Sequence, residues 1–204
     1  MILDIAAIQT LYGANDDAAG EENVYMFDPA VPFSKTIWDP GLGTTDEFDF
    51  SSYAVDLQID LRSGSSSTIP TETWNMDDNL WIAYDSYIEN VRSGSGSDTI
   101  TGNDDANVID GGDGSDVVYG LDGADTFVTV QGGGPDTIKD FVVGEDKLVI
   151  LDEFNSALSF DDLSAEVATD HLHILSDAEL VFILEGHKDT VFVSDFIDET
   201  FVIA

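Results

Sequence analysis

The sequence predicts a mainly β protein, a parallel β-roll with β-sandwich-like flanks and a few short helices. The first observation behind this prediction is a repeat of nine residues that runs from Ser93 to Lys139. Each unit places an apolar residue two positions after an acid or amide, as expected of a very short strand with one side chain turned inward. The second observation is alternation of apolar and polar residues over 54–61, which is typical of a half-buried strand. With 204 residues, 43 % of them apolar, the chain can bury the core of one or two domains.

The segment before the repeat is predicted to be mostly β-structured. Asp4–Tyr12 is the exception, because Asp4 suits a helix N-cap and the following apolar residues recur on one helical face. Residues 63–78 are polar and are expected to form an exposed loop. Short strands are predicted at 23–27, 35–38, 54–61, 80–84 and 87–91.

Five repeat units can be aligned on their sixth residue, and they share the template Gly-Gly-x-Gly-x-Asp-x-apolar-x. A flexible Gly- and Asp-rich linker could supply one such unit by chance, but five units in near register argue against a linker. The units are 93–101, 102–110, 111–119, 120–128 and, after a slip of two residues, 131–139. The eighth residues, predicted to point inward, are Ile100, Ile109, Val118, Phe127 and Ile138.

This template has the chemistry of a calcium-binding loop. Glycine permits positive φ in a tight loop and lets carbonyl oxygens point towards an ion. Aspartate supplies a hard anionic oxygen, the kind of ligand that Ca²⁺ prefers. Because two units make one turn of a roll, loops i and i+2 stack, and several Ca²⁺ ions are predicted to lie between the stacked loops.

The segment after the repeat is also predicted to be β-rich. Asp140–Leu151 should form two strands around a turn at 144–146. Ser159 is a suitable cap for a helix that starts at 159–163. A hairpin is predicted from 171–175 and 179–184, and the chain closes with an acidic segment and an apolar tail, 195–204.

The charge of the chain excludes several classes of partner. It has 42 acidic and 6 basic residues, a formal net charge of −36. Nucleic acid and anionic membranes would be repelled, so neither is an expected partner. Nine of the acids lie in the repeats, and the other 33 are expected to form an acidic surface. The chain has no cysteine, hence neither disulfide nor thiol chemistry, and no apolar run long enough for membrane insertion.

Several segments outside the glycine template carry a more specific resemblance. They are DIAAIQTLYGAN (4–15), NVYMF (23–27), TIWDPG and DEFDFSSY (within 36–53), LQIDLRSG (57–64), LWIAY (80–84) and YIENVRSGSGSDTITGNDDANVIDGGDGSDVVYG (87–120). In this order and spacing they resemble the C-terminal half of the serralysins, secreted zinc proteases of peptidase family M10 with an RTX β-roll. The resemblance divides the chain into 1–22, a remnant similar to the end of the catalytic domain; 23–92, the N-terminal β part of the roll; 93–139, the RTX repeats; and 140–204, a β-rich cap with a type I secretion signal.

The protease centre of that family is not expected in this chain. The family uses a His-Glu-x-x-His-x-x-Gly-x-x-His zinc helix, whereas the only histidines here are His171, His173 and His187. We therefore expect no zinc and no enzymatic activity from the chain itself. His171 and His173 could share one side of a strand as metal ligands, but without an evident third ligand surface-facing histidines are the commoner arrangement.

The resemblance implies three calcium sites in the roll. The first combines carbonyls near four residues with two carboxylates: Gly94, Gly96, Gly111, Asp113, Asp98 and Asp116. The second, on the other edge, is expected to be weaker because Asn107 is neutral: Asn103, Asp105, Asn107, Gly120, Asp122 and Asp125. The third involves the loop after the slip: Gly112, Gly114, Asp116, Gly133 and Asp136.

The resemblance also implies two calcium sites before the roll. Asp39 and Gly41 match the family's Trp-Asp-x-Gly loop, and Asp46 stands for its later aspartate, although two extra residues intervene. Glu89 matches a family glutamate that binds calcium beside the same loop. Carbonyls of Ala19, Glu21 and Asn23 would complete the first of these ligand sets.

These observations lead to one main functional prediction and two alternatives. The main prediction is a non-catalytic, secreted, extracellular calcium-binding RTX module that folds on binding Ca²⁺ and supports export through the type I secretion apparatus. The first alternative is the C-terminal half of a serralysin-like zinc metalloprotease, with a separate or missing protease domain as partner. The second is a carbohydrate- or surface-binding module. Its candidate aromatic residues are Trp38, Phe48, Phe50, Trp74, Trp81 and Tyr84. Trp38, Phe48, Phe50 and Trp81 are expected to pack in the core instead, which leaves Trp74 in the polar loop.

Overall fold

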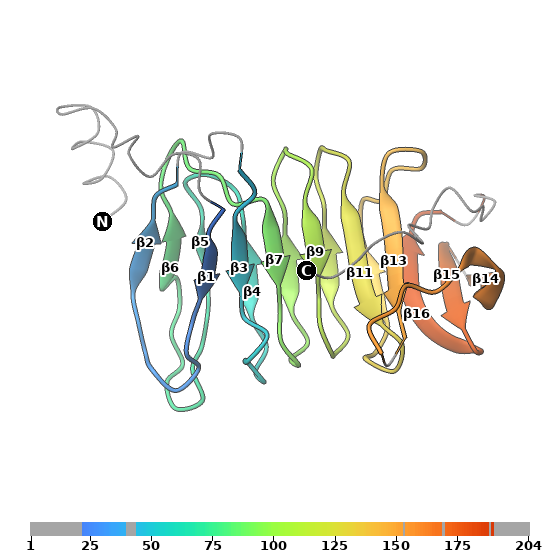
Figure 1. Cartoon of the computed structure of the whole chain (residues 1–204), viewed down its shortest axis with the longest axis horizontal. Coiled ribbons are helices and arrows are strands. Elements are labelled where there is room, and N and C mark those ends of the chain that lie inside the picture. Colours follow the sequence, from blue (N-terminus) through green and yellow to red (C-terminus); the bar gives the residue numbers. More distant parts are fainter. Residues whose placement is uncertain (1–21, 40–43, 153, 169, 188, 190–204) are drawn as a thin grey trace.

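A computed structural model describes residues 22–39, 44–152, 154–168, 170–187 and 189 of the chain. Its strands lie side by side along one long axis, from β2 at one end to β14 at the other (Figure 1). The predicted helix at 4–12, the acidic and apolar segment at 195–204, and Gly41 lie outside the described residues.

Two mainly parallel sheets and one small sheet make up the fold. The six-stranded sheet has the order β1 (Val24–Met26), β3 (Glu47–Asp49), β7 (Asn90–Arg92), β9 (Val108–Asp110), β11 (Thr126–Val130) and β13 (Lys147–Leu151). The seven-stranded sheet has the order β14 (Leu163–Ala168), β15 (His171–Ser176), β16 (Glu179–Glu185), β12 (Asp136–Ile138), β10 (Val117–Tyr119), β8 (Thr99–Thr101) and β4 (Gln58–Asp60). The third sheet contains β2 (Lys35–Ile37), β6 (Leu80–Ile82) and β5 (Ser66–Ser67).

Successive strands from β7 to β13 alternate between the two large sheets, so two repeat units complete one turn. Val117 pairs with Thr99, and Thr126 pairs with Val108, both in parallel and 18 residues apart. The two-residue slip lengthens the next turn, in which Thr137 pairs with Val117. The predicted parallel β-roll is therefore confirmed, and the parallel pairing continues into the N-terminal flank through β1, β3 and β4.

The eighth residues of the repeats form the centre of the core, as predicted. All five are at most 3 % exposed and belong to one hydrophobic cluster. Phe48 and Phe50 are fully buried beside this cluster, which confirms their predicted core position. Trp38 and Trp81 are only partly buried, and Trp74 is 62 % exposed, as expected for a residue of the polar loop.

The flanks differ from the prediction in several places. Residues 63–78 do not form a wholly exposed loop, because they contain β5 and bury Ser67 and Ile69. The strand predicted at 54–61 is limited to β4, although its inward residues Leu57, Ile59 and Leu61 are buried as the alternation required. Only one strand, β13, forms within Asp140–Leu151, because residues 142–146 close a turn in which the Asp146 carboxylate accepts the Val142 N–H.

The predicted helix start at Ser159 is a single 3₁₀ turn, η2 (Phe160–Asp162). Asp162 holds it by accepting hydrogen bonds from the Ser159 N–H and hydroxyl. The chain then enters β14, which the sequence did not predict. β14 pairs with β15 along one side and leaves most of its side chains exposed. Leu163, Ala165 and Val167 alternate with Ser164 and Glu166, so a short apolar alternation was the signal available in the sequence. The hairpin of β15 and β16 confirms the prediction for 171–184.

Candidate metal centre

The sixth-place side chains of the repeats are stacked in two buried rows, one on each edge of the roll. In the first row the Leu57, Asp98 and Asp116 N–H groups donate to the carboxylates one turn further on. The acceptors are Asp98 Oδ1 at 2.7 Å, Asp116 Oδ1 at 2.7 Å and Asp136 Oδ1 at 3.1 Å. Each carboxylate thus uses one oxygen to satisfy a backbone donor of the preceding turn.

The second row contains Asn107, Asp125 and a residue that the sequence analysis missed. The Asn107 N–H donates to Asp125 Oδ1 at 2.9 Å, and the Asp125 N–H donates to Asp146 Oδ1 at 3.0 Å. Asp146 is the sixth residue of a degenerate unit, FVVGEDKLV (141–149), which has glycine in fourth place and the buried Leu148 in eighth. This spacing was the signal available in the sequence, but the loss of the first two glycines concealed it.

The second carboxylate oxygens carry the strongest indication of a ligand. Asp116 Oδ2 and Asp125 Oδ2 are buried and have no hydrogen-bond partner. A buried anionic oxygen without a partner is costly, and a cation bound to it removes this cost. Both oxygens point at the first glycine of their own loop. A Cβ on Gly111 would lie 2.3 Å from Asp116 Oδ2, and one on Gly120 would lie 2.2 Å from Asp125 Oδ2.

Backbone carbonyls complete the surroundings of the first row. Gly112 (φ +78°) and Gly114 (φ +125°) pack so closely on the preceding loop that a Cβ on either would lie 2.0 Å from the carbonyl oxygen of Gly94 or Gly96. The Asp113 N–H donates to the Gly94 carbonyl at 2.9 Å. The structure thus brings together the loops predicted for the first site, with Asp98 and Asp116 buried and the Asp113 side chain exposed.

The loop after the slip also stacks as predicted for the third site. The Gly114 N–H donates to the Gly133 carbonyl at 2.7 Å, and Asp136 is 1 % exposed. Asp98 differs from the other acids of its row, because its Oδ2 accepts a short hydrogen bond from the Ser93 hydroxyl. Carbonyls and Asp116 therefore converge between the loops, while Asp98 is already hydrogen-bonded at both oxygens.

The second predicted site is more occupied by protein hydrogen bonds than expected. Asn107 Oδ1 accepts the Asn103 N–H at 2.8 Å, and Asn107 Nδ2 donates to the Glu89 carbonyl at 2.8 Å. Asn103 Oδ1 accepts the Asp105 N–H, and Asn103 Nδ2 donates to the Ile88 carbonyl. Both amides therefore act as internal struts, and Asp125 is the buried acid of this edge. Asp105 and Asp122 are exposed at its rim.

Burial of these carboxylates shifts their pKa values strongly upwards. Burial, reinforced by the charge of Asp136, raises the pKa of Asp116 to about 9. Burial raises the pKa of Asp125 to about 7 and that of Asp136 to about 7. Burial also raises the pKa of Asp98 and of Asp146. The rows therefore favour protons or other cations over bare negative charge.

The site predicted before the roll is partly assembled. Asn23 Nδ2 donates to Asp39 Oδ2 at 3.1 Å and to Asp46 Oδ1 at 3.2 Å, and the Asp46 N–H donates to Glu89 Oε2 at 2.8 Å. Asp46 Oδ2 is buried without a hydrogen-bond partner, like the oxygens in the rows. Tyr25, which the sequence analysis missed, donates its hydroxyl to Asp39 Oδ2 at 2.7 Å. Gly41, Ala19 and Glu21 lie outside the described residues.

Within the described part of the chain, no three acidic, histidine or cysteine side chains form a metal-binding group on their own. A cation in the rows would therefore need backbone carbonyls as well as the orphaned carboxylate oxygens, and this mixed oxygen set suits Ca²⁺. His173 Nδ1 lies 3.9 Å from Glu166 Oε1, whereas His171 Nδ1 is buried without a hydrogen-bond partner. Both histidines are therefore half-buried and not surface-facing as predicted, and among the described residues neither belongs to a chelating set. In the same described region no helix is long and apolar enough to cross a membrane.

A parallel roll with acid-bearing, glycine-rich loops defines the class of RTX-type β-roll proteins. Within that class, the chain belongs to the family described as peptidase M10 serralysin C terminal, which matches residues 3–203. The match covers almost the whole chain and confirms the resemblance seen in the sequence.

The curated relatives are much longer than this chain. It is 36 % identical over 119 residues to a serralysin of Photorhabdus laumondii subsp. laumondii, covering 52 % of this chain and 24 % of that protein. It is 39 % identical over 112 residues to serralysin C of Dickeya chrysanthemi, covering 49 % and 22 % respectively. The matched region is thus about a quarter of each relative.

Two solved structures are distantly similar in fold. The AlgE6R3 subunit from the Azotobacter vinelandii mannuronan C5-epimerase has a TM-score of 0.42 at 20 % identity, covering 84 % of this chain and 87 % of that one. The extracellular lipase LipA from Serratia marcescens has a TM-score of 0.44 at 16 % identity, covering 90 % of this chain and 37 % of that one.

Proposed function

We propose that this chain is a secreted, non-catalytic calcium-binding module whose β-roll folds when Ca²⁺ binds between its stacked loops. The observation that carries the proposal is the pair of orphaned carboxylate oxygens, Asp116 Oδ2 and Asp125 Oδ2, each buried against the first glycine of its own loop. When bound, Ca²⁺ would supply the positive charge that these oxygens lack. The other predicted ligands of the rows would contribute carbonyl or carboxylate oxygens around the same positions.

The basic side chains of the chain support the need for an external cation. Arg62 pairs with Asp60, Arg92 lies near Glu47 and Asp110, and Lys139 pairs with Glu185. These acids lie outside the sixth-place rows. The chain has only 6 basic residues against 42 acidic ones, so a solution ion is the natural counter-charge for the rows.

Calcium binding and folding would be coupled in this chain. Without the cation, turns that bury carboxylates are disfavoured, and the chain has no disulfide to hold them together. Ligand binding to the folded state alone turns binding free energy into folding free energy. An unfolded chain where calcium is scarce and a folded chain where it is abundant would suit export through a type I secretion channel, with the signal near the C-terminus.

The family membership supports a second candidate at the level of a longer protein. The relatives are proteases by name, and the matched region covers about a quarter of their length. We infer that in such a context the module would stabilise an attached catalytic domain. A protease assay on a chain that joins the module to a zinc-binding domain, with and without calcium, tests that role.

The primary test is far-UV circular dichroism of the chelator-treated chain during titration with Ca²⁺, with Mg²⁺ as the control ion. We expect a cooperative gain of β signal with calcium only. A chain that is fully folded in chelator and indifferent to calcium would contradict the proposal.

A further inference from the structure

A pocket outside the two carboxylate rows has the features of a small-molecule site. Its volume is about 250 Å³, and it lies where the end of β4, the turn before β7 and the loop after β8 meet. Ser86 and Asn103 are its buried lining residues, at 1 % and 8 % exposure. The exposed lining residues are Arg62, Ser63, Tyr87, Asp104 and Asp105, and the pocket shares Asn103 and Asp105 with the second predicted calcium site.

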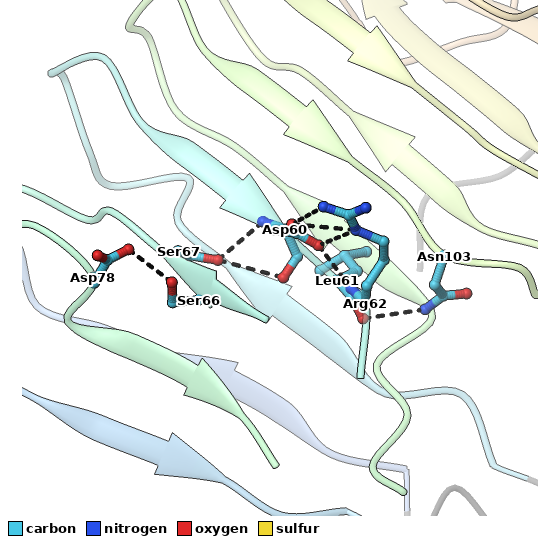
Figure 2. Close-up of polar contacts among 7 residues, drawn as sticks. All are labelled: Asp60, Leu61, Arg62, Ser66, Ser67, Asp78 and Asn103. Atoms are coloured by element: carbon cyan, nitrogen blue, oxygen red, sulfur yellow. Dashed lines mark hydrogen bonds and ion pairs between the residues drawn. The ribbon is translucent and has the colours of Figure 1, made fainter. Parts of the chain in front are cut away.

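Arg62 is held in one orientation before any ligand arrives. Its Nε donates to Asp60 Oδ1 at 3.0 Å and its Nη2 to Asp60 Oδ2 at 2.6 Å, and its backbone N–H also donates to Asp60 Oδ1 (Figure 2). A guanidinium has five N–H donors, so this clamp leaves three of them for another acceptor. A fixed donor fork loses little entropy when it binds.

The other lining groups supply complementary chemistry. Asp104 lies within electrostatic reach of Arg62 and makes no hydrogen bond among the described residues. The Tyr87 ring is 42 % exposed, and its hydroxyl likewise has no partner there. Asn103, in contrast, donates to the Ile88 carbonyl at 2.8 Å. It also donates to the Leu61 carbonyl at 3.5 Å (Figure 2), so both of its amide hydrogen bonds are made within the protein.

We propose that this pocket binds a neutral sugar unit. A sugar hydroxyl can accept from the free guanidinium donors while a neighbouring hydroxyl donates to Asp104. The apolar face of a sugar ring suits the exposed Tyr87 ring, which combines an apolar body with a polar tip. Asp60 already neutralises Arg62 and the whole chain carries −36, so a uronate or phosphate ligand would be repelled. The pocket goes beyond calcium binding and requires only that the roll is folded.

Saturation-transfer NMR and isothermal titration on the full chain in millimolar calcium test this proposal, after circular dichroism has verified the fold. The probes are methyl α-D-glucopyranoside, methyl α-D-mannopyranoside and methyl β-D-galactopyranoside, with sodium glucuronate and glycine as charged comparisons. We expect saturable binding of at least one neutral glycoside, weakened about tenfold by Tyr87→Ala or by Arg62→Met, which corresponds to about 1.4 kcal/mol.

Tyr119→Ala is the matched control, because Tyr119 is 37 % exposed on β10 and does not line the pocket. Its affinity for the glycoside should equal that of the unmodified chain. The proposal is overturned if folded protein binds none of the neutral glycosides, if glucuronate or glycine binds better, or if neither pocket variant changes the affinity. Loss of calcium-dependent folding would show separately in the circular dichroism.

Discussion

Replacement of Asp116 by asparagine should have opposite effects with and without calcium. The carboxylate is buried, its Oδ1 accepts the Asp98 N–H, and its Oδ2 has no partner. Asparagine has nearly the same shape and keeps an oxygen for the Asp98 N–H, but it carries no charge. In chelator at pH 7 the substitution removes the cost of protonating a carboxylate when it is buried, whereas in calcium it removes an anionic ligand.

The expected size of the effect follows from the pKa of Asp116. Burial raises this pKa from 3.8 to about 9. A raised carboxylate pKa means that stability is fully present below pH 3.8 and is lost as pH rises towards 9. A pH of 7 is about three units above 3.8, which corresponds to a loss of up to about 4 kcal/mol in the free energy of unfolding. Asp116→Asn avoids this loss, so it should be up to about 4 kcal/mol more stable than the unmodified chain in chelator at pH 7 and equal to it near pH 4.

The assay is urea unfolding in chelator, followed by far-UV circular dichroism at pH 4 and pH 7. If the unmodified chain is unfolded at pH 7, an osmolyte titration of folding gives the same difference. In the presence of calcium, Asp116→Asn should raise the calcium concentration at the folding midpoint about tenfold or more. Asp77→Asn, exposed and outside every predicted site, is the control and should stay within about 0.5 kcal/mol. Equal stability of Asp116→Asn and the unmodified chain in chelator at pH 7 would refute the reasoning.

Three other predictions follow from the same geometry. Because burial raises the pKa of several row carboxylates, the chelated chain should gain β signal on acidification from pH 7 to pH 4, whereas a flat circular dichroism profile would contradict this. Gly112→Ala should lower the free energy of unfolding in calcium by more than about 3 kcal/mol, measured by urea unfolding, because its Cβ would lie 2.0 Å from the Gly94 carbonyl oxygen. Gly132→Ala is the control: its φ is similar but the space around it is open, so the loss should be only about 1 kcal/mol. Ile109→Ala should lower the free energy of unfolding by about 2–5 kcal/mol in the same assay, whereas Val142→Ala, at a side chain that is 42 % exposed, should change it by no more than about 0.5 kcal/mol. Equal losses for the two variants would show that the eighth position does not form the core.

The nine-residue period made the central fold predictable, because every unit repeats the same pattern of a glycine-rich loop followed by a short strand with one apolar residue. The inward position of Ile109 and Phe127 and the stacking of alternate loops both follow from that period. β14 was missed although Leu163, Ala165 and Val167 alternate with Ser164 and Glu166. Five alternating residues are a weak signal, and β14 is an exposed edge strand held by its pairing with β15.

The residue types of the candidate site were predictable, but which of its oxygens are hydrogen-bonded within the protein and which are left without a partner was not. The aspartate positions follow from the template, yet the sequence cannot show that Asp98 uses both oxygens within the protein while Asp116 leaves one unpartnered. The internal role of the Asn107 amide is likewise set by the Glu89 carbonyl, 18 residues earlier in the chain. Such assignments depend on which backbone groups the neighbouring turns present.

The two rows also explain why this roll should be a folding switch and not merely a scaffold with bound ions. Each sixth-place acid caps a backbone N–H of the preceding turn, so the same side chain that stabilises the stack also carries its electrostatic cost. Removing the acids would orphan backbone donors, and keeping them without a cation buries charge. Under the proposed function, an ion bound between the loops would resolve both demands at once, and at ten times its dissociation constant each ion would contribute about 1.4 kcal/mol. Since these contributions add from turn to turn while a single domain is stable by only about 5–15 kcal/mol, a few ions suffice to decide whether the chain is folded.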